Sequence, residues 1–144
     1  FKHRKSIVNQ REVGADTESW EQRAAKVMED LAGEGTIEAY VKNAFLGFRI
    51  PYQKPTGQPA NYEPDFIVRA KGGTSGEDIR IIVEITGFNQ DKQDKRWTVQ
   101  HRWLPAVNSV APHYHWPRWH FVEADSEDGL KNLKPTLSDL IQQL

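Results

Sequence analysis

Four stretches of the chain have the sequence pattern of α-helices: residues 20–31, 37–45, 91–104 and 130–144. Ser19, followed three positions later by Gln22, is typical of a capping box at the start of the first helix. We expect Pro105 to end or restart the third helix, which is polar and charged, and Pro135 to interrupt the last one. The pattern thus predicts helices near both ends of the chain and on either side of its central part.

Four shorter stretches have the character of β-strands: residues 47–52, 65–69, 79–86 and 118–123. The third is apolar almost throughout, which is typical of a central strand that is covered on both faces. Because the glycine-rich residues 71–76 join the second strand to the third, we expect these two to form an antiparallel hairpin. Residues 53–61, which are rich in proline and glycine, are expected to be a loop.

The order of these elements is helix, three strands, helix, strand, helix. This order predicts an α/β fold in which a mixed sheet is flanked by helices on both faces. A chain of 144 residues is long enough for one domain with a core and too short for two full ones. Because the chain begins with Phe1 and not with Met, we expect it to be part of a longer protein.

The composition excludes several classes of protein. The chain has no cysteine, which rules out disulfides, thiolate zinc sites and cysteine nucleophiles and fits a cytoplasmic protein. No stretch approaches the roughly 20 apolar residues of a membrane helix, and no signal peptide is visible. The net charge of −1 does not indicate a nucleic-acid-binding protein, but residues 92–120 carry five lysines and arginines against one aspartate. One end of the fold is therefore suited to face phosphates.

Two carboxylates are the strongest candidates for chemistry. Asp65 begins one strand of the expected hairpin and Glu84 lies near the end of the other, so antiparallel pairing brings them together. A carboxylate in so apolar a strand is unfavourable unless it is paired, protonated or bound to a cation, and two carboxylates repel each other. A divalent ion relieves both problems, and oxygen ligands point to Mg²⁺. Strand alternation places Glu84 and Thr86 on one face, with Val83 and Ile85 on the other.

These residues also have simpler interpretations. A single glutamate in a strand is commonly solvated or salt-bridged, and an aspartate that follows proline is commonly a turn or cap residue. If Asp65 and Glu84 lie far apart in the fold, a generic protein-interaction domain remains the better interpretation.

Several strings together resemble one enzyme family. Residues 62–68 (Tyr-Glu-Pro-Asp-Phe-Ile-Val) and 82–87 (Ile-Val-Glu-Ile-Thr-Gly) resemble the PD-(D/E)xK nuclease pattern, and the element order αβββαβ is that of the restriction-endonuclease-like core. Six further strings resemble the C-terminal endonuclease domain of type III restriction enzyme Res subunits: Ser19-Trp20-Glu21, Tyr40-Val41-Lys42-Asn43, Leu46-Gly47-Phe48, Ile50-Pro51-Tyr52, Trp103-Leu104-Pro105-Ala106-Val107-Asn108 and Trp119-His120-Phe121-Val122-Glu123. The similarity covers residues 17–124, with 1–16 as an N-terminal extension and 125–144 as a C-terminal helix.

The resemblance implies roles for individual residues. Asp65 and Glu84 would hold Mg²⁺, for which Mn²⁺ can substitute, and the ion would polarise a phosphate and lower the pKa of an attacking water. Glu21, on the first helix, matches an acid that often completes the ligand set. It is also a common kind of first-turn glutamate, favoured by the helix dipole. The carbonyl oxygen of Ile85 would be a further ligand.

The sequence departs from the family pattern at Thr86, where the nucleases carry a lysine that orients water and stabilises negative charge. A lysine from the following helix offers one replacement; Lys95 matches a lysine that relatives carry there, and Lys92 is the next candidate. Alternatively, the site is degenerate and the domain only binds DNA or mediates assembly.

We therefore expect a metal-dependent DNA endonuclease domain that hydrolyses phosphodiester bonds of double-stranded DNA. The resemblance implies a helicase or ATPase portion in the same parent protein and a methyltransferase subunit as partners. Expected DNA contacts come from residues with positive charge or an exposed ring: Lys92, Arg96, Arg102, Tyr114 and Arg118.

Other polar and aromatic residues have structural interpretations. Residues 113–120 hold three histidines and would permit a zinc site, but a packed aromatic loop is the simpler expectation. Asn43 and Asn108 are expected to bond loops or caps. The tryptophans of the second half of the chain, apart from one in the aromatic loop, are expected in the core: Trp97, Trp103 and Trp119.

Overall fold

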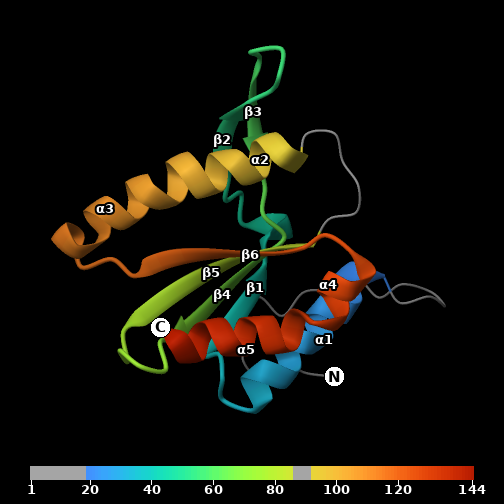
Figure 1. Ribbon diagram of the computed structural model, residues 1–144, viewed down its shortest axis with the longest axis vertical. Coiled ribbons are helices and arrows are strands. Elements are labelled where there is room, and N and C mark those ends of the chain that lie inside the picture. Colours follow the sequence, from blue (N-terminus) through green and yellow to red (C-terminus); the bar gives the residue numbers. More distant parts are fainter. Residues whose placement is uncertain (1–18, 86–91) are drawn as a thin grey trace.

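The computed structural model describes residues 19–85 and 92–144 and has a four-stranded mixed sheet at its centre (Figure 1). The strands follow the order β1-β4-β5-β6, with bounds Ala39–Lys42, Phe66–Lys71, Asp78–Ile85 and Arg118–Ala124. The first three pair antiparallel, and β6 runs parallel to β5. The expected hairpin between the second and third sheet strands is confirmed.

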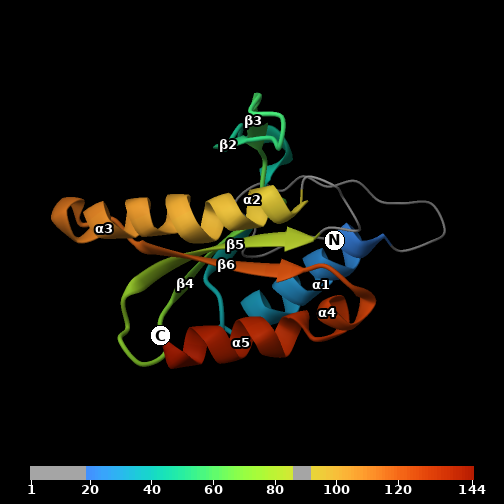
Figure 2. The same ribbon diagram turned by 45° about the horizontal axis from the view of Figure 1, so that its top comes forward.

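Helices cover both faces of the sheet (Figure 2). On one face lie α1 (Trp20–Gly33), α4 (Glu127–Lys131) and α5 (Leu133–Gln143). On the other face, α2 (Lys92–Thr98), a π-helical segment (Val99–Trp103) and α3 (Leu104–Tyr114) form one long helical rod. The predicted class, a mixed α/β fold with a mixed sheet between helices, is therefore observed.

Alternation along β5 decides which side chains meet which helices. Ile81, Val83 and Ile85 belong to the core shared with α1 and α5. Ile82 points the other way, into the second core that includes Val99. Because Glu84 is two residues from Ile82, it shares the α2–α3 face, as the sequence predicts for that position.

The start of α1 follows the prediction closely. The Ser19 side chain accepts a hydrogen bond from the Gln22 backbone N–H at 3.1 Å, and the Gln22 side chain accepts one from the Ser19 N–H at 2.8 Å. This capping box satisfies two of the N–H groups that a helix start leaves without partners. It also fixes the first turn, which carries Glu21.

The predicted helix over residues 37–45 is wrong. The segment forms β1, which pairs with β4 through Tyr40 and Val68, and then a short 3₁₀ turn, Asn43–Phe45. Both faces of β1 are covered, so its apolar residues follow one another without the alternation of a half-exposed strand. Such a short run cannot be distinguished from a helical stripe by spacing alone.

A separate hairpin stands outside the main sheet and projects beyond α2 (Figure 1). It consists of β2 (Ile50–Gln53) and β3 (Pro59–Tyr62), which pair antiparallel. The predicted strand at residues 47–52 is thus real but is not the first strand of the sheet, and half of the predicted loop is strand. Of the two prolines that indicated a loop, Pro55 lies in the turn between the strands and Pro59 is exposed at the start of β3, a position that proline tolerates.

Both late helices differ from the prediction in their bounds. Pro105 lies in the first turn of α3 and the rod continues to Tyr114, where His115 ends it in a left-handed conformation. The C-terminal helix divides into α4 and α5 at Asn132, while Pro135 sits in the first turn of α5, where proline is tolerated. None of the helices in the described part of the chain has the length and apolar character of a membrane span.

Candidate metal and phosphate site

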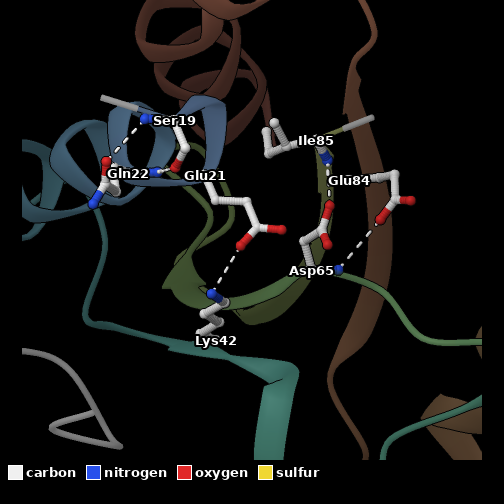
Figure 3. Close-up of polar contacts among 7 residues, drawn as sticks. All are labelled: Ser19, Glu21, Gln22, Lys42, Asp65, Glu84 and Ile85. Atoms are coloured by element: carbon white, nitrogen blue, oxygen red, sulfur yellow. Dashed lines mark hydrogen bonds and ion pairs between the residues drawn. The ribbon is translucent and has the colours of Figure 1, made fainter. Parts of the chain in front are cut away.

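Asp65 and Glu84 lie side by side at one end of the sheet (Figure 3). The register pairs Phe66 with Val83, so the residues next to them, Asp65 and Glu84, face each other across the hairpin. The Ile85 N–H donates to Asp65 Oδ2 at 2.7 Å, and the Asp65 N–H donates to Glu84 Oε1 at 3.2 Å. The expectation that antiparallel pairing brings these carboxylates together is confirmed.

Their environment disfavours two negative charges. Glu84 is buried, with 6% of its surface exposed, and burial followed by the charge of Asp65 raises its pKa to about 8. Burial also raises the pKa of Asp65, although the hydrogen bond from Ile85 opposes this change. A cation shared by the two groups would offset both effects.

Tyr62 is a member of the site that the sequence interpretation missed. Its hydroxyl is buried and has no hydrogen-bond partner in the described structure. Burial, and next the charge of Glu84, raises the pKa of the Tyr62 hydroxyl, so the phenol stays protonated. The two groups therefore lie close enough to affect each other, though not at hydrogen-bonding geometry. The sequence signal that could have indicated Tyr62 is its position three residues before Asp65.

Glu21 approaches the pair from the other side. Figure 3 shows the Asp65 side chain between those of Glu21 and Glu84. The negative charge of Glu21 acts to raise the pKa of Asp65, whereas the positive charge of Lys42 acts to lower it. Lys42 Nζ lies 2.8 Å from Glu21 Oε2. The structure thus places Glu21 near enough for its charge to act on Asp65, while its predicted role as a metal ligand stays a prediction. It also adds Lys42, which sequence reasoning did not single out.

Lys95 reaches the neighbourhood of the site from α2. Its ammonium lies 5.7 Å from the centroid of the Tyr62 ring, whose hydroxyl is close to Glu84. Thr86 and the side chain of Lys92 lie outside the described residues. The structure shows the N–H of Ile85 on Asp65, and the predicted role of the Ile85 carbonyl as a ligand stays a prediction.

Among the predicted DNA-contact residues, Arg96 lies near the carboxylates, because its partner Glu123 is the register neighbour of Glu84 on β6. Arg96 is engaged by Glu123 at 2.6 Å and by Asp125 at 3.2 Å. Arg118 is the first residue of β6, whereas the carboxylates lie beside the last residues of that strand, near Ala124. Arg118 and Ala124 are six strand positions apart, which corresponds to about 20 Å. These contacts stay predictions.

The aromatic residues divide into a packed and an exposed group. Trp103 and Trp119 pack against the second core and against Phe48, as expected. Trp97 is 48% exposed, so its assignment to the core is wrong. Its ring is covered by two neighbours instead, His101 at 4.9 Å and the guanidinium of Arg102 at 5.2 Å.

Two further predictions are confirmed by hydrogen bonds. Asn43 donates to the Phe48 carbonyl at 2.8 Å and accepts from the Phe48 N–H at 3.3 Å. Asn108 makes the same pair of bonds with Trp119, at 2.9 and 2.8 Å. Asn43 thus bonds the loop at Phe48, and Asn108 bonds the β6 residue Trp119, whose other neighbour is Arg80 of β5. In the aromatic loop, the exposed Tyr114 ring stacks on Trp116 with centroids 4.8 Å apart.

The donor set fits a hard divalent cation. Within residues 19–85 and 92–144, no group of three or more acidic or histidine side chains is arranged to hold a metal. Two adjacent carboxylates suffice for Mg²⁺, which usually binds one or two carboxylates and completes its shell with water and substrate phosphates. Asp65 and Glu84 would hold the ion.

Comparison with protein families, characterised proteins and solved structures finds no significant match to this chain.

Proposed function

We propose that the chain is a Mg²⁺-dependent DNA endonuclease domain with a restriction-endonuclease-like core. The observation that carries this proposal is the buried Asp65–Glu84 pair at the end of a mixed sheet, with Glu21, Lys42 and Lys95 around it. Carboxylates that share a site are costly in a structural core and useful for holding a cation. The order and directions of the four sheet strands support the same assignment.

In the proposed reaction, a water oxygen bonds to phosphorus and gives up one proton to solvent while one phosphorus–oxygen bond breaks, and the leaving oxygen takes up one proton from solvent. Bound Mg²⁺ supplies polarisation of the phosphate and a lowered pKa of the water. Asp65 and Glu84 hold the cation, and the Ile85 N–H fixes the orientation of the Asp65 carboxylate. The Tyr62 hydroxyl is a protonated donor beside Glu84. A lysine offsets negative charge in this reaction; the resemblance to the nucleases implies Lys95 as one candidate, and Lys42 is a second lysine near the carboxylates.

The proposed substrate is double-stranded DNA, and Mn²⁺ is the expected substitute for Mg²⁺. The proposed setting is a cytoplasmic restriction enzyme, in which a helicase or ATPase portion of the parent protein and a methyltransferase subunit bring the target DNA to this domain. Lys92, Arg96, Arg102, Tyr114 and Arg118 are the proposed DNA contacts.

A second candidate function is a nuclease-like module that has lost catalysis and serves DNA binding or assembly. Position 86 favours it, because threonine stands where the nuclease pattern has lysine. The absence of a three-carboxylate cluster from the described residues is consistent with it as well.

Cleavage of supercoiled plasmid distinguishes the two functions. We expect the purified chain to nick plasmid in Mg²⁺ or Mn²⁺ and not in EDTA, and we expect Asp65→Asn and Glu84→Gln each to reduce the rate by at least about 100-fold. Asp78→Asn is the matched control, because Asp78 lies at the far end of β5 in an exposed ion pair with Lys71. If the chain binds DNA but shows no nicking that is lost in the Asp65 and Glu84 variants, the second function is supported instead.

A further inference from the structure

The proposed site has an unbalanced charge. Asp65, Glu84 and Glu21 contribute three negative charges when ionised, and a bound phosphodiester adds a fourth. One divalent cation supplies two positive charges. Negative charge also grows on the phosphate oxygens as the reaction proceeds, so the site needs a fixed cation near the phosphate.

Lys42 is held at the edge of this site by the backbone. It is the last residue of β1 and pairs with Phe66, the residue that follows Asp65. The next N–H, that of Asn43, donates to the Asp65 carbonyl at 2.9 Å. The strand pairing of Lys42 and the hydrogen bond of Asn43 together fix the backbone position of Lys42.

The side chain of Lys42 is also oriented. The register puts Lys42 on the same face as Phe66, which packs toward α1, and there its ammonium meets Glu21 at 2.8 Å (Figure 3). Glu21 is in turn fixed by the capped first turn of α1. The Lys42 side chain keeps 30% of its surface exposed, and its ammonium has three N–H donors, of which the contact with Glu21 needs only one.

Lys95 is placed differently. Its ammonium lies over the face of the Tyr62 ring, 5.7 Å from the ring centroid. A cation above an aromatic ring is stabilised there by the ring itself. Lys42, in contrast, contacts Glu21, whose charge acts on Asp65.

We propose that Lys42 is the lysine that contacts the scissile phosphate, in place of the lysine absent at position 86, with Glu21 as the residue that positions it. This inference rests on the proposed nuclease function and names the residue that carries its fixed positive charge.

Lysine variants in the whole chain test the inference. We expect Lys42→Met to lower the single-turnover cleavage rate by about 100-fold or more, and Lys42→Gln to do the same. Lys95→Met should cause a smaller loss. Lys71→Met is the matched control, because Lys71 makes an ion pair of the same length, 2.8 Å, at the opposite end of the sheet. It should leave the rate unchanged.

Metal binding gives a readout that separates catalysis from support of the fold. Titration calorimetry with Mn²⁺ should show Lys42→Met binding the ion as tightly as the unaltered chain or more tightly, because a positive charge next to the site has been removed. A merely structural Lys42 would lower metal affinity and thermal stability along with the rate. Lys42→Arg, which keeps charge and the contact to Glu21, should restore part of the activity.

The outcomes are distinguishable. Full cleavage by Lys42→Met, or a larger loss in Lys95→Met, overturns the role of Lys42 and leaves the nuclease function standing. Parallel loss of cleavage, Mn²⁺ binding and thermal stability in the Lys42 variants also overturns it. If the unaltered chain neither binds Mn²⁺ nor nicks plasmid, both the proposed function and this inference fail.

Discussion

At the scale of single residues, burial and a neighbouring charge make Glu84 sensitive to pH. Its pKa in the folded chain is about 8, against an ordinary value of 4.5, so the folded state binds this proton more tightly than the unfolded state does. Below pH 4.5 both states are protonated. As the pH rises from 4.5 to 8, Glu84 ionises in the unfolded state, which lowers the free energy of that state, while Glu84 in the folded state stays protonated. Folding therefore becomes less favourable with increasing pH.

We predict that the free energy of unfolding in EDTA, measured by urea denaturation, decreases between pH 5 and pH 8. In Glu84→Gln, which cannot ionise, most of this dependence should disappear, and saturating Mg²⁺ should reduce it in the unaltered chain. Equal pH dependence of the two chains in EDTA would show that Glu84 is not the group responsible.

The sequence predicts the contact between two residues where the pairing of their strands is enough to bring them together. Asp65 and Glu84 were predictable because strand pairing alone determines their meeting. Lys42 and Tyr62 were not, because their places depend on β1 and β3. One of these strands was interpreted as helix and the other as loop.

At the scale of elements, the errors have a common cause. The strongly patterned elements, α1, β5 and β6, were predicted within a few residues. Covered strands of four residues, such as β1, carry too few positions to show a period. The break between α4 and α5 at Asn132 follows from tertiary packing, since the leucine stripe continues across it.

The contact between the β4–β5 loop and α5 is a second feature of this scale. The Gly73 N–H donates to the Ile141 carbonyl at 2.7 Å, and a Cβ at Gly73 would lie 2.9 Å from Gln142 Cα. The loop thereby adds a second, shorter hydrogen bond to a carbonyl that also accepts from the Leu144 N–H at 3.3 Å. Only glycine permits so close an approach of two backbones.

We predict that Gly73→Ala lowers the free energy of unfolding by about 1–3 kcal/mol, because the added methyl forces the loop away from α5. Gly33→Ala is the control: nothing lies within 4 Å of its Cβ, and its position ends α1. That variant should be neutral or slightly more stable. Equal effects of the two substitutions in chemical denaturation would refute the close-packing argument.

At the scale of the whole molecule, charge is divided between the two helical layers. The rod from α2 to α3 carries one acid, Asp94, while α1 and α4 on the opposite face are rich in acids. A DNA duplex approaching the carboxylates therefore meets less repulsion along the α2–α3 side. Arg118 lies at the far end of that side, about 20 Å from the site, a length of roughly six base pairs.

This layout gives a prediction about DNA affinity. The binding assay uses Ca²⁺ in place of Mg²⁺ so that binding is measured without cleavage. We expect Arg118→Ala to weaken binding of a 20-base-pair duplex. It should also reduce the slope of the logarithm of the binding constant against the logarithm of the salt concentration by about 1. Lys131→Ala is the control, because Lys131 is an exposed base on α4, in the acidic layer. Fluorescence anisotropy over a salt series measures both slopes. If the salt slope changes for Lys131→Ala and not for Arg118→Ala, the duplex lies on the face covered by α1 and α4 and not along the α2–α3 rod. A single straight duplex cannot follow the helical layers on both faces of the sheet at once.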